Sequence, residues 1–81
     1  MSQFEKLESK MRNNPKGWVI EELRKILKAY GFVEGVHGRG SHVTFSHPDL
    51  VDILTIPVHK PIKPVYVKQI IAQIDYLKEN K

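Results

Sequence analysis

Residues 31–56 read GFVEGVHGRGSHVTFSHPDLVDILTI, and after Gly31 the spacing of apolar side chains changes from a helical period of about 3.6 to an alternation of period 2. The alternation is clearest over 41–47, where Val43 and Phe45 share one side of an extended chain. The opposite side of this segment carries the polar residues His42, Thr44 and Ser46. The pattern predicts a strand that buries one face and leaves the other open.

A further strand is predicted on each side of this segment. Residues 32–36 can form a strand, and residues 51–56 are rich in branched side chains that favour extended structure. Glycines over 38–40 and the Pro-Asp pair at 48–49 predict turns between the three segments. Because connections this short join antiparallel neighbours, we expect a three-stranded antiparallel sheet.

Helices are predicted before and after the strands. Residues 18–30 and 65–78 place apolar side chains every three or four positions, and Pro64 suits the first turn of the second of these helices. A shorter helix is predicted over 3–13, followed by a break at 13–17. We therefore expect an α+β fold, with helices on one face of the sheet and an extra helix at the N-terminus.

The composition limits the classes of protein to consider. A chain of 81 residues forms one domain, residues 1–81, in which 1–17 add a helix and turn to a core at 18–78. With no cysteine, disulfide scaffolds, catalytic thiols and thiolate zinc sites are excluded. The net charge of +4 favours a nucleic-acid partner. No stretch is apolar enough for a signal sequence or membrane span, so we expect a cytoplasmic protein without a membrane partner.

All four histidines fall between residues 37 and 59, and His42 has the most informative position among them. It follows a glycine turn and begins a strand, which holds a side chain firmly. An imidazole can give or take a proton at cellular pH, as cleavage of RNA through its own 2′-hydroxyl requires. That route needs no metal, and His42 and His47 lie on opposite faces of a regular strand, so we expect no metal and no cofactor.

Phosphate-binding groups are predicted around His42. Arg39 offers a fixed positive fork, and the glycine turn at Gly40 and Ser41 exposes backbone amides to an anion. Three lysines fall beside the proline-rich loop and the start of the last helix: Lys60, Lys63 and Lys68. His59 could support the site or pack against that helix. Purely structural alternatives stay open here. A glycine before a histidine in a strand is common in hairpins, and surface lysines are commonly solvated without binding a ligand.

Several spaced motifs resemble the HicA toxins of bacterial and archaeal toxin–antitoxin pairs over roughly residues 18–76. They are Gly31-Phe32, Gly40-Ser41-His42, His47-Pro48, Ile56-Pro57-Val58-His59 and the segment KPVYVKQII at 63–71. The resemblance implies a fold like a double-stranded-RNA-binding domain, ribonuclease activity against messenger RNA, and neutralisation by a HicB antitoxin. It assigns the catalytic role to His42, and it matches a second, proline-associated histidine of the family to His59 without giving it a role.

Three functions therefore compete at this point. The first is a metal-independent endoribonuclease that cleaves messenger RNA and inhibits translation, with an antitoxin that covers the face carrying His42. The second is a non-catalytic RNA-binding module that uses the same basic surface. The third is a protein-interaction domain whose open sheet face pairs with a partner.

Overall fold

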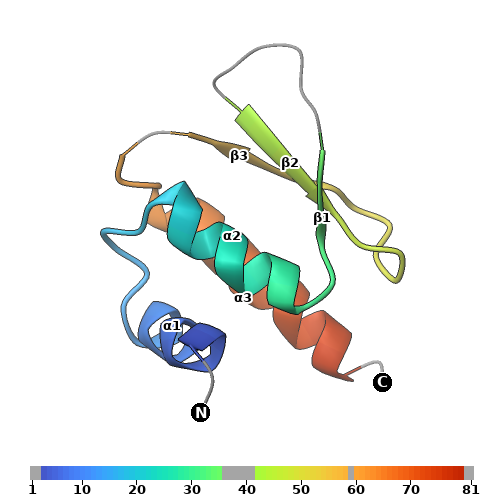
Figure 1. Ribbon diagram of the computed structural model, residues 1–81, viewed down its shortest axis with the longest axis horizontal. Coiled ribbons are helices and arrows are strands. Elements are labelled where there is room, and N and C mark those ends of the chain that lie inside the picture. Colours follow the sequence, from blue (N-terminus) through green and yellow to red (C-terminus); the bar gives the residue numbers. More distant parts are fainter. Residues whose placement is uncertain (1–2, 36–41, 59, 80–81) are drawn as a thin grey trace.

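The computed structural model describes residues 3–35, 42–58 and 60–79. The elements, in chain order, are α1 (Gln3–Asn13), α2 (Ile20–Ala29), β1 (Val33–Gly35), β2 (His42–Ser46), β3 (Leu54–Pro57) and α3 (Pro64–Glu79). Helices α2 and α3 lie on one face of the sheet, and α1 lies beyond these helices, away from the strands (Figure 1). This arrangement confirms the expected α+β fold and its extra N-terminal helix, and it is compatible with a double-stranded-RNA-binding-domain topology.

The sheet has the order β1-β2-β3, and both pairs of neighbours are antiparallel. Val43 pairs with Ile56, and Phe45 pairs with Leu54. All four of these side chains are at most 5% exposed, so the predicted burial of one face of β2 is confirmed. The predicted turn at 38–40 lies outside the described residues.

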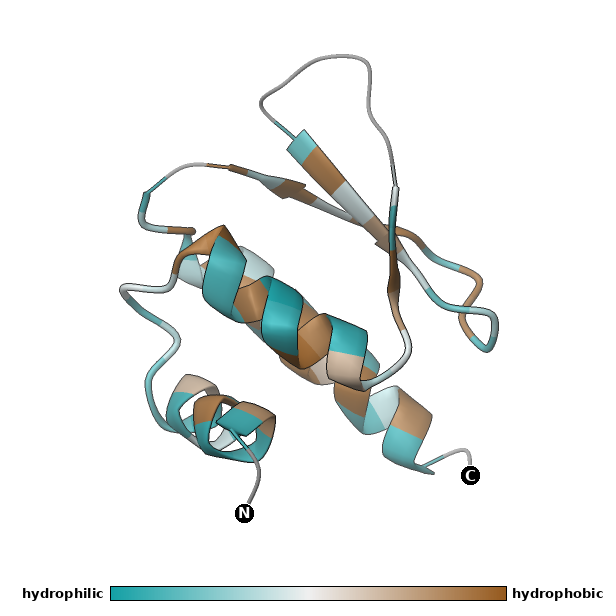
Figure 2. Cartoon of the chain, viewed as in Figure 1, coloured by the Kyte–Doolittle hydropathy of each residue, from teal (hydrophilic) through white to brown (hydrophobic). Residues whose placement is uncertain are grey.

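The core lies between this face of the sheet and the two covering helices. The fully buried residues of the helices form one stripe on each, Leu23, Ile26 and Leu27 on α2 and Val67, Ile70 and Ile74 on α3. Figure 2 shows hydrophobic and hydrophilic residues alternating along α2 and α3, and the buried hydrophobic residues of both helices belong to one core cluster with those of the strands. Each such side chain contributes roughly 1.5–3 kcal/mol to folding, so these two stripes hold the layers together. Among the described residues, no helix has the length and hydropathy needed to cross a bilayer.

Strand β3 begins three residues later than predicted. Leu54 is its first residue because its partner Phe45 is the last residue of β2 that pairs with β3. The strand follows a turn over 47–50, which the Leu50 amide closes on the carbonyl of His47 at 3.0 Å, and a bend at 51–52. Val51 is therefore 98% exposed, although its branched side chain favours a strand. The strand also runs one residue further than expected, to Pro57.

Strand β1 begins one residue later than predicted because the end of α2 uses the backbone before it, and the predicted last residue, Val36, lies outside the described residues. Gly31 adopts a positive φ of 91°, and the amide of Phe32 donates to the carbonyl of Leu27 at 3.1 Å. This is a glycine-terminated helix end of the kind expected for Gly31. The side chain of Phe32 is buried, but its amide is committed to the helix, so the strand starts at Val33.

Helix α2 begins at Ile20 rather than at Trp18, because the backbone of Trp18 pairs with a distant segment. The amide of Ile62 donates to the carbonyl of Trp18 at 2.7 Å, and Trp18 Nε1 donates to the carbonyl of Asn14 at 2.7 Å. The indole is 6% exposed and belongs to the core. The bridge holds the start of α2 against the segment that leads into α3.

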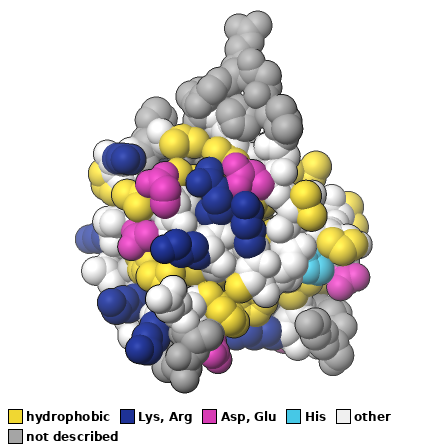
Figure 3. Space-filling view, in the orientation of Figure 1, with side chains coloured by type: hydrophobic (Ala, Val, Ile, Leu, Met, Phe, Trp, Pro, Cys, Tyr) yellow, Lys and Arg dark blue, Asp and Glu magenta, His cyan; other side chains and the backbone are white. Residues whose placement is uncertain are grey.

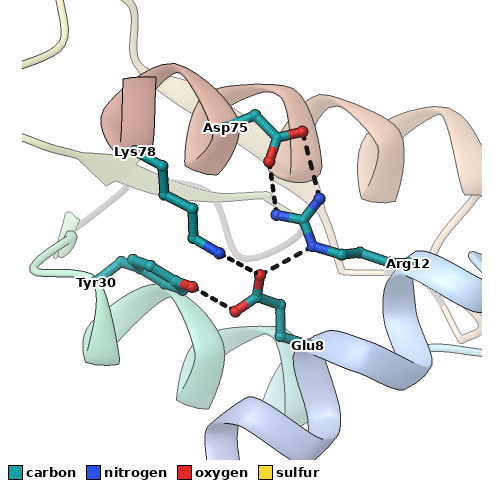
Figure 4. A network of polar contacts seen from close by, with 5 residues as sticks. All are labelled: Glu8, Arg12, Tyr30, Asp75 and Lys78. Carbon is teal, nitrogen blue, oxygen red and sulfur yellow. Dashed lines mark hydrogen bonds and ion pairs between the residues drawn. The ribbon is translucent and has the colours of Figure 1, made fainter. Parts of the chain in front are cut away.

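A network of charged groups docks α1 against both other helices (Figure 4). The carboxylate of Glu8 accepts from Tyr30 Oη at the end of α2, from Lys78 Nζ on α3 at 3.0 Å, and from Arg12 Nε at 2.9 Å. Arg12 also makes a bidentate pair with Asp75 of α3, with its shorter bond at 2.7 Å. Glu8 is 6% exposed, and its carboxylate is the centre of the interface among the three helices.

Two opposing effects act on the pKa of Glu8. Burial raises it, whereas the hydrogen bonds from Tyr30, Lys78 and Arg12 lower it, and the net effect holds the pKa below the ordinary value of 4.5. A carboxylate with a lowered pKa in the folded state stabilises the fold above its unfolded pKa. That contribution disappears as the pH falls through the folded pKa.

We predict that Glu8→Gln lowers the free energy of unfolding by about 1–3 kcal/mol at neutral pH, because Lys78 and Arg12 lose a charged partner at a nearly buried site. The difference from the parent protein should shrink as the pH falls below about 4.5. Urea unfolding at a series of pH values measures both effects. Glu21→Gln at an exposed position of α2 is the matched control, and an equal loss in the two variants would contradict the role of Glu8.

Candidate functional site

His42 begins β2, the central strand of the sheet, and its side chain is exposed. It lies opposite Pro57, the last residue of β3, so it occupies the end of the sheet where β3 leads into the segment before α3. Val43 is buried against the helices, and the alternation of the strand therefore turns His42 toward the face that α2 and α3 leave uncovered (Figure 1). The predicted orientation of His42 is confirmed.

Small polar residues surround His42 on this open face. Thr44 follows it on the same side of β2 and pairs with Gly35 of β1 and Thr55 of β3. The one carboxylate among the described strand residues, Glu34, pairs with Phe45 and so lies on the helix side. There it accepts from Arg24 of α2 at 2.7 Å. The described strand residues therefore place no negative charge on the open face.

Gly35 is required by its neighbour Thr44. A Cβ atom added at Gly35 would lie 2.2 Å from Thr44 Oγ1, closer than any unstrained contact. The hydroxyl of Thr44 therefore occupies the space above β1 that a side chain at position 35 would fill. Neither Gly35 nor Thr55 was predicted from the sequence to belong to the site. A glycine inside a predicted strand was the available signal, since such glycines mark close approach of a neighbouring group.

The predicted lysines lie around the start of α3. Lys60 and Lys63 are exposed on either side of Ile62, which is fully buried and tied to Trp18. Lys68 is exposed on α3, whose first turn contains no acidic residue. Lys60 and Lys63 thus follow directly from the strand end that pairs with His42. The remaining predicted groups, Arg39, Gly40, Ser41 and His59, lie outside the described residues.

His47 has a structural role in the turn after β2. Its Nε2–H donates to the carbonyl of Tyr30 at 3.0 Å, and its Nδ1 accepts from the amide of Asp49 at 3.0 Å. The ring also packs edge-on against Phe32, with 5.1 Å between the ring centroids. Both ring nitrogens of His47 therefore hold the turn.

Positive charge on the face that carries α2 is mixed with negative charge. Figure 3 shows Lys and Arg side chains interspersed with carboxylates there, without one continuous basic patch. Arg24 and Lys28 both face Glu34, at 2.7 and 3.9 Å. The cations near the start of α3 have no such partner among the described residues, so that corner is the better candidate for binding an anion.

Comparison with known proteins identifies one family. The family model described as "HicA toxin of bacterial toxin-antitoxin" matches residues 20–76, which is more than half of the chain and spans α2, the sheet and most of α3. Helix α1 precedes the matched region. No curated protein and no solved structure matches the chain significantly.

We predict that Gly35→Ala lowers the free energy of unfolding by about 1–3 kcal/mol, because the stiff side chain of Thr44 cannot move aside freely. Adding Thr44→Ala should recover most of this loss, since it removes the atom that the new methyl group meets. Urea unfolding of the two single variants and the double variant measures the coupling. Simple addition of the two single losses would show that the side chains do not meet.

Proposed function

The chain belongs to the HicA toxin family, and from this premise we propose that it is an endoribonuclease that cleaves messenger RNA and inhibits translation. The observation that carries the proposal is the exposed imidazole of His42, at the start of a central strand and on a sheet face that no helix covers. A group in this position is accessible to a large substrate and is held by the strand ladder behind it.

The proposed reaction uses the 2′-hydroxyl of the RNA as the nucleophile. The imidazole of His42 takes the proton of that hydroxyl, the 2′-oxygen bonds to the adjacent phosphorus, and the bond from phosphorus to the 5′-oxygen breaks. The leaving 5′-oxygen takes a proton from the imidazolium or from water, so the products are a 2′,3′-cyclic phosphate and a 5′-hydroxyl. The route requires no metal. A single histidine cannot act as base and acid at the same moment, so we expect slow turnover.

Cations at the same end of the sheet would hold the phosphate. Exposed Lys60 and Lys63 follow the strand end opposite His42, and Lys68 lies further along α3. They would stabilise the charge that develops on the phosphate oxygens. Arg39, the glycine turn at Gly40 and Ser41, and His59 complete the proposed RNA-binding set from the sequence.

The family places the chain in a toxin–antitoxin system, which is consistent with an antitoxin partner. We propose that a HicB-like antitoxin neutralises the toxin by covering the face that carries His42. The chain itself supports this route, because its own helices all lie on the other side of the sheet. A complex that leaves His42 open to RNA would contradict it.

We predict that His42→Ala abolishes growth arrest and lowers the rate of RNA cleavage at least about 100-fold, while folding and RNA affinity are kept, because only the proton-transfer group is lost. Cleavage of a labelled RNA by purified protein measures the rate. The products should carry 2′,3′-cyclic phosphate ends, and a chelator should have no effect.

Ser46→Ala, on the same face of the same strand, is the matched control for that experiment and should cleave at the parental rate. If His42→Ala stays as toxic as the parent, the nuclease proposal fails. If in addition it binds RNA with unchanged affinity, the chain is a non-catalytic RNA-binding module. If the protein shows no salt-dependent affinity for RNA at all, the remaining interpretation is a protein-interaction domain.

We predict that Lys60→Ala and Lys63→Ala each weaken RNA binding and lower the slope of log affinity against log salt by roughly 0.7, the value for loss of one contact to a single strand. Titrations at several salt concentrations measure the slope. Lys6→Ala on α1, which lies beyond the helices and away from the sheet, is the control. Equal slopes in all the proteins would remove the corner near α3 from the RNA-binding surface.

A further inference from the structure

We propose that Thr44 and Thr55 form a hydroxyl pair that binds the ribose–phosphate backbone of the RNA beside His42. The inference rests on the proposed function, because it states how the same site holds its substrate. Neither threonine is among the residues that the sequence assigned to the site. Three properties of the sheet support the pair: its register, the hydrogen bonding of the two hydroxyls, and the other side chains on the open face.

The register places the two threonines directly opposite each other. Thr44 and Thr55 are Cα partners in the pairing of β2 with β3, two residues along from the pair of His42 and Pro57. Cβ atoms of directly opposite residues lie roughly 4.5–5.5 Å apart. His42 is two residues from Thr44 on the same side of β2, a distance of roughly 7 Å along a strand. The Thr44 hydroxyl lies over Gly35 of β1 and Thr55 lies on β3, so a backbone that crosses β2 beside the imidazole can contact both hydroxyls.

Both hydroxyls are available to a ligand. In the parts of the chain that the structure describes, neither threonine side chain makes a hydrogen bond. Thr55 is exposed, and Thr44 is half-buried. Every fully buried side-chain oxygen among the described residues has a hydrogen-bond partner. Because the Thr44 hydroxyl has none, it is not fully buried, so both hydroxyls reach solvent. Their β-branched side chains are stiff, and a ligand would bind them at little cost in conformational entropy.

The surroundings of the pair suit an anionic backbone. Gly35 has no side chain, and the Thr44 hydroxyl occupies the space above it where a larger residue would stand. Glu34 is turned to the helix side and bound to Arg24, so the described strand residues place no carboxylate near the pair. Hydroxyls of Ser and Thr are common ligands of phosphate and sugar oxygens.

The contacts that this face offers are mainly polar, to RNA and to an antitoxin alike. Stable protein interfaces are built around buried aromatic or large apolar side chains. The open face offers only Val33 of this kind among the described strand residues. The other strongly exposed apolar residues, Val51, Ile53, Val65 and Tyr76, lie outside the strands. Apart from the imidazole, the described strand residues of this face include no aromatic ring for base stacking, so the contact is to the backbone and not to a base.

The test measures RNA binding in the His42→Ala background, where cleavage cannot interfere. A short fluorescent single-stranded RNA is titrated with the His42→Ala protein and with the same protein carrying Thr44→Val or Thr55→Val. Valine keeps the branched shape and removes the hydroxyl. We expect each change to weaken binding about three- to tenfold, the range for loss of one hydrogen bond. Ser46→Ala in the same background should change the affinity less than about twofold.

A DNA strand of the same sequence separates the two parts of the backbone. If the hydroxyl pair contacts the ribose, the valine variants should bind the DNA as the parent does. If it contacts phosphate, they should lose affinity for both strands equally. Either pattern supports the proposal. Thermal unfolding confirms that the variants are folded.

Unchanged RNA affinity in both valine variants would overturn the inference, and it would do so without touching the nuclease proposal, which depends on cleavage by the parent protein. Conversely, a parent protein that does not cleave RNA would end the nuclease proposal, while weakened binding in the valine variants would still establish the hydroxyl pair. If the variants bind RNA normally and lose affinity only for a co-purified antitoxin, the two hydroxyls contact the antitoxin and not RNA, and the inference is wrong.

Discussion

The burial of Phe45 is the constraint on which both the fold and the proposed site depend. Its side chain is fully buried between the sheet and the helices, and its neighbours in the sheet are Leu54 on one side and Glu34 on the other. Because side chains alternate along a strand, burying Phe45 and Val43 turns His42 outward. A slip of one residue in the register would bury the imidazole and expose the core. The apolar contacts that stabilise the protein therefore also orient its candidate catalytic group.

The N-terminal helix is held by a different kind of interaction. Met11 is fully buried, and Phe4 packs edge-on against Tyr30, with 5.8 Å between the ring centroids. The charges around Glu8 then connect α1 to α2 and to α3. These contacts lie on the side of the helices away from the strands, so α1 adds a layer without obstructing the open face (Figure 1). The region that matches the family begins only after this helix.

The sequence alone predicts what depends on local periodicity. The alternation around Phe45, the stripes of the last two helices and the glycine end at Gly31 are such features, and the structure confirms them. Features that depend on a distant partner leave no mark in the local pattern of side chains. The late start of β3 is set by the end of its neighbour, and the extended backbone of Trp18 is set by Ile62.

The same distinction holds for individual side chains. Glu8 could have been suspected, since it lies four residues after Phe4 and three before Met11, within the apolar stripe of its helix. In the site, the outward direction of His42 follows from local alternation, but the contact between Gly35 and Thr44 requires the register. The roles of Arg39, Gly40, Ser41 and His59 stay predictions.

The bridge between Trp18 and Ile62 also bears on how the protein is made. A chain leaves the ribosome N-terminus first. Lys60 and Lys63 are placed only when Ile62 reaches Trp18, and the core is complete only when Ile70 and Ile74 of α3 have joined it. A nascent chain therefore displays its central strand before it has a basic corner or a closed core. The helix layer behind the sheet that carries His42 is therefore complete only after the last helix has left the ribosome.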